Sequence, residues 1–288
     1  MRTLQAILST LVTYVVTILI VMAASTSGLY WNSIPLFGLF AVLAFVVQWV
    51  VFVPSFLLQT EHYFDLTGSL TYLGIVACAV FLTPNLDTRD ILICVMIALW
   101  AIRLGSFLFW RVKKSGGDDR FVDLKPHFWV FFMVWNIQAL WVFLTLASAM
   151  GAMTSSNKQA LGIFALIGTI VWIVGFAFEV IADQQKTAFR ALPENKDTFI
   201  QTGLWSICRH PNYFGEITLW LGIAIIAFPV LSGWTYATLI SPVFVTILLT
   251  RISGIPMLAE KGKKKWGADP AYQEYLKNTP VLIPGIRL

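Results

Sequence analysis

The chain has 288 residues, of which 58% are hydrophobic and only 12% are charged, and its mean hydropathy is +0.76. Because a soluble domain carries about 25% charged residues, this composition excludes an ordinary soluble protein and indicates an integral membrane protein. The formal net charge of +5 is explained by basic loops that set topology and contact anionic lipid, so nucleic acid is not an expected partner.

Eight apolar runs are long enough to cross a bilayer as helices. They lie at residues 4–24, 34–58, 68–83, 90–110, 127–150, 160–182, 213–230 and 234–250. The run at 68–83 is short and bounded by Pro84, which leaves seven spans as the alternative. The first run has features of a signal peptide, but its length favours an uncleaved span. The sequence therefore predicts an all-α bundle of seven to eight spans, and it lacks the alternating pattern of a membrane β-barrel.

Basic residues are distributed unequally between the two sets of loops. The loops opposite the termini contain only Arg89 and Lys158. The other side holds most of the remaining cations, including Lys113, Lys114, Arg120, Lys125, Lys186, Arg190, Lys196, Arg209, Lys261, Lys263, Lys264, Lys265 and Lys277. By the positive-inside rule, both termini are predicted to face the cytoplasm, and the Lys261–Lys265 stretch is interpreted as a lipid-surface patch.

Arg103 lies well inside the fourth run. A charge there costs about 2.5–3.5 kcal/mol on insertion scales, so we expect it to face the bundle interior or water, with snorkelling as the alternative. Its candidate partners are carboxylates predicted near the cytosolic ends of other spans, namely Glu61, Asp65, Glu179, Asp183 and Glu216.

The end of the sixth run carries a group of charged residues. Glu179 and Asp183 are four residues apart and share a helix face, while Lys186 and Arg190 lie on the following turns. An ordinary solvated helix end would explain the pattern. The functional alternative is a wall that contacts a nucleotide, since Arg and Lys suit phosphates and carboxylates suit ribose hydroxyls.

The stretch Gly203 to Glu216 concentrates polar residues where a cytosolic loop enters the seventh run. Arg209 and His210 end the loop, and Pro211 favours the first turn of a helix. A helix N-terminus beside Arg and His is a natural anion site, so this stretch is a candidate cofactor site. The three His and three Cys residues show no metal-ligand spacing, and no metal is expected.

This stretch resembles the signature of the steroid 5α-reductase-like membrane reductases, in particular the branch with the DUF1295 domain. The resemblance covers about residues 55–288, so residues 1–58 are interpreted as N-terminal transmembrane helices and 59–288 as a membrane domain similar to the steroid 5α-reductase C-terminal (DUF1295) domain. Further similar segments are Phe64 to Tyr72, Leu99 to Leu104, Asp118 to Phe121, Gln138, Ala182 to Lys186, and Tyr272 to Tyr275.

The resemblance implies an NADPH-dependent reductase, like a 3-oxo-5α-steroid 4-dehydrogenase, that saturates a conjugated C=C bond in a lipophilic enone. The family Glu that polarises the substrate carbonyl matches Glu61, with Asp65 as the alternative. The family Tyr, three residues before the position of Arg103, is replaced by Trp100. The catalytic set implied by the resemblance is therefore Glu61, Asp65, Trp100 and Arg103. An indole N–H donates a hydrogen bond but transfers no proton, so either Tyr63 or Tyr72 serves as donor or the substrate differs.

The local pattern and the resemblance together give a cofactor-binding set on the cytosolic side of a bacterial inner membrane or of the endoplasmic reticulum. Arg251 follows the last run, and an aromatic tail closes the site in similar proteins. The set comprises Glu179, Asp183, Lys186, Arg190, Arg209, His210, Asn212, Tyr213, Glu216, Arg251, Tyr272 and Tyr275.

The main alternative is a membrane S-adenosylmethionine-dependent methyltransferase of the isoprenylcysteine carboxyl type. These enzymes also carry an Arg-His-Pro-x-Tyr element followed by Gly-Glu. Phe64 to Ser69, Arg103 and the Asp183–Arg190 group favour the reductase. A non-enzymatic carrier is disfavoured because no inverted repeat is visible. The sequence leaves the substrate and the oligomeric state open.

Overall fold

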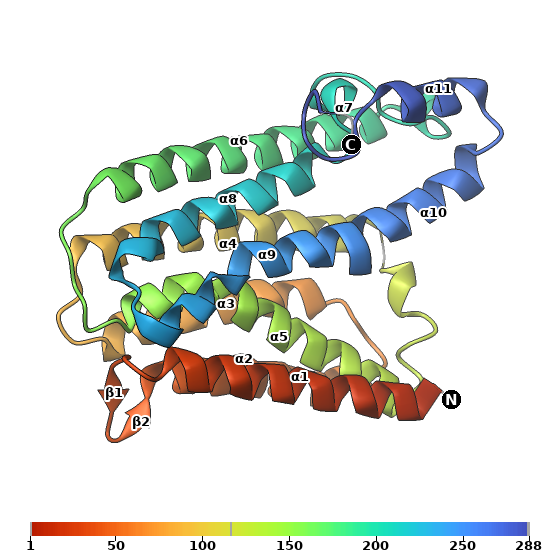
Figure 1. The fold of residues 1–288 in the computed structure, drawn as a ribbon. Coiled ribbons are helices and arrows are strands. Elements are labelled where there is room, and N and C mark those ends of the chain that lie inside the picture. The colour runs from red at the N-terminus through yellow and green to blue at the C-terminus, as the bar shows by residue number, and fades with distance from the viewer. Residues whose placement is uncertain (1, 116, 287–288) are drawn as a thin grey trace. The chain divides into compact units, whose positions relative to one another are not determined.

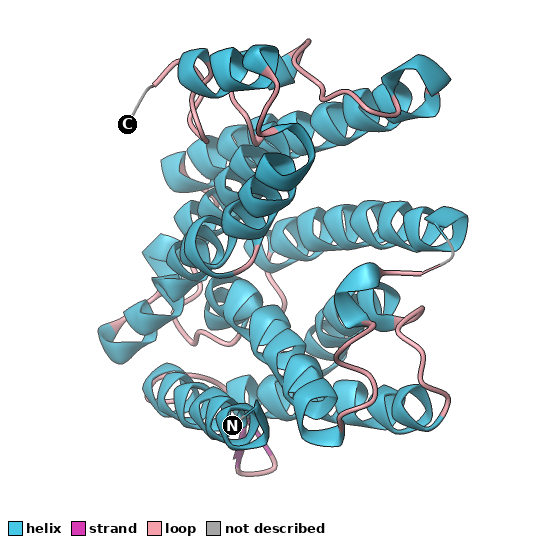
Figure 2. Ribbon diagram, turned by 90° about the vertical axis from the view of Figure 1, so that its right-hand side faces the viewer, coloured by secondary structure: helices cyan, strands magenta, loops and turns pink. Residues whose placement is uncertain are grey.

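The computed structural model describes residues 2–115 and 117–286, whose regular secondary structure is helical apart from one small hairpin (Figures 1 and 2). Residues 287–288, at the end of the predicted 59–288 domain, and the side chain of Asp119 lie outside the described part. The long helices are α1 (Arg2–Ala24), α2 (Leu36–Leu57), α3 (Phe64–Leu82), α4 (Thr88–Ser115), α5 (Phe128–Met153), α6 (Ile163–Ala191) and α8 (Pro211–Ala227). The hairpin pairs β1 (Tyr30–Trp31) with β2 (Ile34–Pro35).

Eight helical stretches are long and apolar enough to cross a membrane, which confirms the predicted all-α class and the upper span count. The doubtful run at 68–83 forms α3. The eighth stretch, Gly233–Trp266, is composite and extends beyond the predicted end at 250. It consists of a 3-10 segment (Gly233–Leu239), α9 (Ile240–Ile247), a π-helical turn (Leu248–Ile252) and α10 (Gly254–Trp266).

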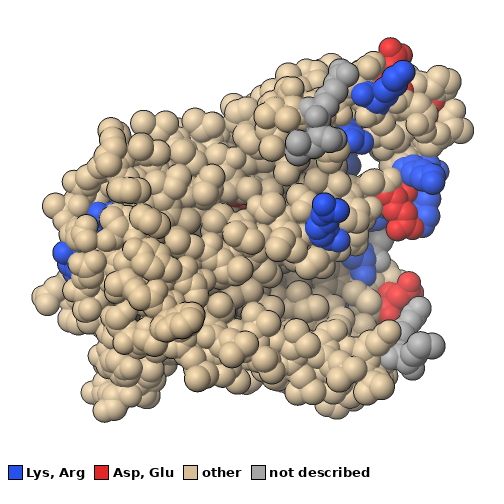
Figure 3. Space-filling model, in the orientation of Figure 1, with Lys and Arg blue, Asp and Glu red and all other residues tan. Residues whose placement is uncertain are grey.

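The chain forms two compact units that interleave in sequence. Unit 1 comprises residues 1–164 and 226–240, and unit 2 comprises 165–225 and 241–288. In both units, the long helices satisfy their backbone N–H and C=O groups internally, as a bilayer requires. On the face shown in Figure 3, most of the Lys, Arg, Asp and Glu side chains gather towards the left and right edges of the view, and the broad area between them is almost free of charge.

Unit 1 is built around α5, whose residues from Val142 to Met153 are buried. Helices α2 and α3 pack beside it, and an aromatic cluster of Phe52, Phe121, Phe131 and Trp135 fills one end. The same cluster holds Phe121, a residue of the loop after α4, so part of this loop belongs to the core of the unit.

The two cations predicted on the opposite side have structural partners. Arg89 is 2% exposed and donates to the carbonyl oxygens of Ile226 at 2.6 Å and Ala160 at 3.0 Å. Lys158 pairs with Asp90 at 2.6 Å. Because Ile226 lies in the last turn of α8, Arg89 satisfies a carbonyl that the helix leaves without an internal partner.

In unit 2, α6 and α8 approach backbone to backbone because glycines line their contact (Figure 1). A Cβ on Gly175 would lie 2.6 Å from the carbonyl oxygen of Gly215, and a Cβ on Gly215 would lie 2.5 Å from the Glu179 nitrogen. One heptad along, a Cβ on Gly222 would lie 2.7 Å from the carbonyl oxygen of Gly168. Small residues permit such close helix packing in membranes, and this contact fixes Glu179 beside the first turns of α8.

We predict that Gly215→Ala destabilises unit 2, because the added methyl group would overlap the α6 backbone. Overpacking of this kind costs about 1–3 kcal/mol and would lower the thermal unfolding midpoint of the purified protein in detergent. Gly74→Ala is the matched control, since a Cβ at Gly74 meets nothing within 4 Å. Equal midpoints for the two variants would contradict the close contact.

Candidate functional site

The end of α6 carries two buried carboxylates. Glu179 is 3% exposed and Asp183 is 7% exposed. The side-chain amide of Asn212, in the first turn of α8, donates to Asp183 Oδ1 at 3.4 Å. Glu216 follows Asn212 by one helical turn. The structure therefore joins Asp183 to Asn212 and packs the Glu179 backbone against Gly215, the residue before Glu216, and the glycine contact between α6 and α8 explains this proximity.

The loop before α8 folds over the end of α6 through Trp205, in the short helix α7 (Leu204–Ile207). The Trp205 indole donates to the Ala182 carbonyl at 3.1 Å, and the Lys186 ammonium lies 4.5 Å from the centre of a Trp205 ring. Gln185 Oε1 accepts from the Leu204 amide at 2.9 Å. Gly203 has φ +61, and a Cβ there would lie 2.6 Å from Gln185 Oε1, so both conformation and space require glycine.

Arg209 and His210 lie at the start of α8. The Arg209 amide donates to the Pro280 carbonyl at 2.8 Å, and the His210 ring stacks on Tyr213 with centroids 5.6 Å apart. Arg209 Nε and His210 Nδ1 are buried and have no hydrogen-bond partner among the described residues. Burial, together with the nearby charges of Lys186 and Arg209, lowers the pKa of His210 to about 3. The imidazole is therefore neutral at pH 7.

Two further predicted cations lie in unit 2 at exposed positions. Arg190 is in the last turn of α6, and Arg251 is in the π-helical turn between α9 and α10. Such turns are rare and frequently occur at functional sites. Next to this turn, Gly254 packs closely against Tyr213. A Cβ at position 254 would lie only 2.8 Å from the Tyr213 ring.

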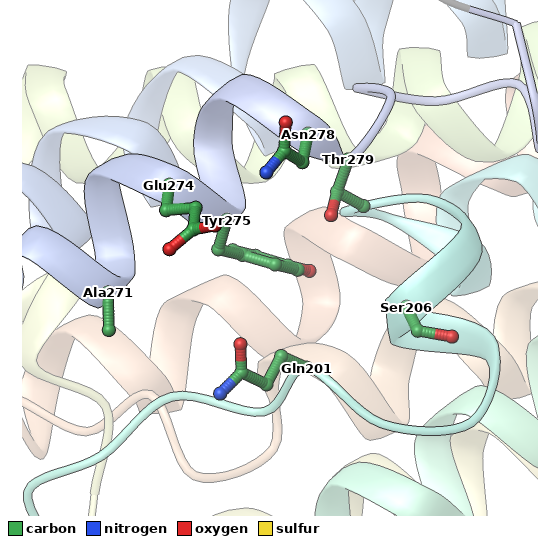
Figure 4. A pocket seen from close by; sticks show the side chains of 7 residues that line it. All are labelled: Gln201, Ser206, Ala271, Glu274, Tyr275, Asn278 and Thr279. Carbon is green, nitrogen blue, oxygen red and sulfur yellow. The ribbon is translucent and has the colours of Figure 1, made fainter.

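The predicted aromatic tail forms a cluster in α11 (Pro270–Asn278). The rings of Tyr272 and Tyr275 lie 5.0 and 5.4 Å from that of Phe199, and the Tyr275 hydroxyl donates to the Trp205 carbonyl at 2.8 Å. Tyr275 also lines an open pocket of about 370 Å³, where its ring extends from α11 across the pocket above Gln201 (Figure 4). These bonds attach α11 to the Trp205 loop, and contact of either Tyr with a cofactor stays a prediction.

The predicted catalytic residues all lie in unit 1, where Glu61 has the clearest surroundings. Glu61 is 5% exposed, forms an ion pair with Lys125 and accepts from the Asp118 amide at 3.0 Å. Burial by itself raises the pKa of Glu61, but these hydrogen bonds outweigh it and leave the pKa below its ordinary value. Glu61 is therefore ionised at pH 7 and is an acceptor of hydrogen bonds.

The other three lie on α3 and α4. Asp65 is 3.7 Å from Arg111, and Arg103 lies over the ring of Phe107 at 5.3 Å. Trp100 is 2% exposed, and its ring meets that of Tyr72 edge to face at 5.0 Å. Tyr63 is 55% exposed and Tyr72 only 5%, so Tyr72 is the phenol that accompanies Trp100 in the interior.

Two residues with clear roles were not singled out from the sequence. Gln185 holds the Leu204 amide, and Lys125 pairs with Glu61 from 64 positions away. Gln185 lies in the Ala182 to Lys186 segment, which is one of the segments that carry the family resemblance. No local pattern marks Lys125 as a partner of Glu61, because the pairing depends on how the loop after α4 folds back.

Comparison with known proteins identifies the family. A family described as a protein of unknown function, DUF1295, matches residues 51–279. The chain belongs to the DUF1295 family. An uncharacterised protein of Schizosaccharomyces pombe is 24% identical over 183 residues, which cover 52% of this chain and 53% of the yeast protein. This chain thus spans about half the length of that relative. No solved structure matches.

The DUF1295 match includes every residue of both candidate sets, from Glu61 to Tyr275. Within the described ranges, no group of three or more His, Cys, Asp and Glu residues is arranged to hold a metal ion. Unit 2 combines the buried carboxylates Glu179 and Asp183 with the cations Lys186, Arg190, Arg209 and Arg251.

We predict that stability falls as the pH drops below about 6.5, because the unfolded His210 binds a proton there and the folded one does not until about pH 3. Thermal unfolding midpoints between pH 7 and pH 4 measure this loss. His210→Gln should flatten the dependence, whereas His62→Gln, at an exposed position, should leave it unchanged. A wild-type slope in His210→Gln would contradict the neutral, buried imidazole.

Proposed function

We propose that the protein is an integral-membrane reductase that binds NADPH through unit 2 and saturates a conjugated carbon–carbon double bond in a lipophilic enone. The observation that supports this best is the buried Asp183 carboxylate, which the Asn212 amide contacts beside Glu179. Carboxylates accept hydrogen bonds from ribose hydroxyls. A buried carboxylate is costly, and such positions in membrane proteins usually mark functional sites.

The cations of unit 2 favour a cofactor that carries phosphates. Lys186, Arg190, Arg209 and Arg251 belong to the same unit as Asp183. NADPH presents a diphosphate and a further phosphate, whereas S-adenosylmethionine presents one carboxylate and a cationic sulfonium. Four cations therefore match NADPH better, and Arg side chains bind phosphate oxygens with two parallel hydrogen bonds.

When bound, NADPH would supply a hydride to the β-carbon of the enone. The chain's own task is to stabilise the enolate charge that develops on the carbonyl oxygen and to deliver a proton to the α-carbon. We assign the hydrogen bond to the carbonyl to Tyr72, supported by Trp100, whose ring packs against it. An ionised Glu61 cannot donate such a bond, so the proposal does not use it for this step.

The charge asymmetry of the loops supports a cofactor site that faces the cytoplasm, where NADPH is available. The substrate would enter from the bilayer, and its apolar body would contact the abundant Leu, Phe and Trp side chains. A bacterial inner membrane and the endoplasmic reticulum membrane both fit this arrangement.

We predict that NADPH raises the thermal unfolding midpoint of the detergent-purified protein, and that S-adenosylmethionine does not. At a ligand concentration 100 times Kd, binding stabilises the folded state by about 2.7 kcal/mol. Asn212→Ala and Arg190→Ala should reduce the NADPH shift, because each removes a polar group at the proposed site.

Lys264→Ala is the matched control for Arg190→Ala, since Lys264 is an exposed cation paired with Glu260 one turn away on α10. Stabilisation by S-adenosylmethionine instead of NADPH would replace the reductase by the methyltransferase. An unchanged NADPH shift in both variants would exclude the assigned cofactor residues.

We predict that Tyr72→Phe lowers enone reduction about 100-fold at unchanged NADPH affinity, because it removes the proposed donor and preserves the ring. Steady-state turnover of NADPH with a steroid enone such as progesterone measures this. Tyr63→Phe, at an exposed tyrosine, should retain activity. A greater loss in Tyr63→Phe would move the donor role to Tyr63.

A further inference from the structure

The loop between α4 and α5 contains a compact segment, residues 117–125, which we name the cap segment. Its internal hydrogen bonds join the Phe121 amide to the Asp118 carbonyl at 3.1 Å and the Leu124 amide to the Phe121 carbonyl at 3.0 Å. Arg120 pairs with Asp118 at 2.5 Å. The segment is therefore a folded turn and not an extended linker.

Phe121 anchors the cap segment to the rest of unit 1. It is 4% exposed, and its ring centre lies 4.9 Å from that of Phe64 in the first turn of α3. Trp135 packs against the other side of Phe64 at 5.1 Å. The cap segment thus covers the beginning of α3 and the aromatic cluster behind it.

Glu61 contacts both ends of the cap segment with its two carboxylate oxygens. Oε1 accepts from the Asp118 amide at 3.0 Å, and Oε2 pairs with the Lys125 ammonium. Gly117 lies so close that a Cβ there would be 3.2 Å from Oε1. The carboxylate is buried, while the Lys125 side chain is 20% exposed. Removing one partner of a buried ion pair is strongly destabilising, because it leaves the other charge uncompensated.

We propose that Glu61 is a positioning residue whose carboxylate holds the cap segment closed over the first turn of α3. The covered interior includes Gln138, whose amide donates to the Phe64 carbonyl at 2.8 Å and whose Oε1 is buried with no partner among the described residues. Opening of the cap segment would remove Phe121 from Phe64 and expose this polar interior. Glu61 therefore acts through the cap segment and does not contact the reacting atoms.

Hydrogen–deuterium exchange of the purified full-length protein tests the positioning role without requiring any enzymatic activity. Glu61→Gln and Lys125→Met should each speed the exchange of amides 118–125 by about tenfold, because each removes the same ion pair. The double variant should exchange no faster than either single variant, since the two residues act as one pair. The charge exchange of Glu61→Lys with Lys125→Glu should recover part of the protection.

Asp123→Asn is the matched control, because Asp123 is an exposed carboxylate in the same segment and should leave exchange unchanged. The buried amides of α5 from Val142 to Met153 serve as an internal reference for intact folding. Exchange of amides 118–125 within twofold of wild type in Glu61→Gln and Lys125→Met would overturn the proposal. Equal opening in Asp123→Asn, or additive effects in the double variant, would also overturn it.

A kinetic measurement separates positioning from direct catalysis, and this part rests on the proposed reductase function. If Glu61 acts through the cap segment, Lys125→Met lowers turnover as much as Glu61→Gln does. If Glu61 contacts the substrate, Glu61→Gln lowers turnover far more than Lys125→Met, and the proposal fails. The absence of NADPH binding would refute the proposed function alone, because the exchange experiment does not depend on it.

Discussion

The cost of placing charge in an apolar chain determines where this protein can carry polar chemistry. A charged side chain is tolerated only where it is hydrated, paired or bonded to backbone groups, so the charges gather near helix ends. Arg89 shows the constraint clearly, since it is nearly inaccessible and donates to backbone carbonyls at the end of α8 and beyond α5. Arg89 therefore has a structural task as the partner of these carbonyl groups.

In unit 2 the buried carboxylates lie where two helices pack backbone to backbone. The glycines of α6 and α8 bring Glu179 and Asp183 next to the first turn of α8, where Asn212 offers a hydrogen bond. Trp205 then closes the end of α6 through the Ala182 carbonyl. Unit 2 therefore combines buried carboxylates with several cations, and the proposal of a phosphorylated nucleoside as its ligand rests on this combination.

In unit 1 the same constraint gives Glu61 a different character from that implied by family resemblance. Its carboxylate is ionised and shared between Lys125 and the Asp118 amide, which suits the attachment of a loop and not the donation of a proton. The interior of the unit offers other polar groups, above all Tyr72 beside Trp100. Glu61 thus holds a loop in place, whereas the proposed chemistry uses Tyr72 and Trp100, although the family resemblance grouped Glu61 with the catalytic residues.

The sequence by itself determined the membrane class, a count of seven to eight spans and the concentration of polar residues in Gly203 to Glu216, because hydropathy and charge bias act locally along the chain. The structure gives eight candidate spans, because the short run at 68–83 forms a full helix. It also identified Asp183 and Asn212, but not their contact, which requires two glycine pairs on different helices. Only the tertiary structure decided that Lys125 pairs with Glu61 and that Tyr72, not Tyr63, lies against Trp100. These outcomes depend on side chains that meet across long sequence separations, and no local periodicity encodes them.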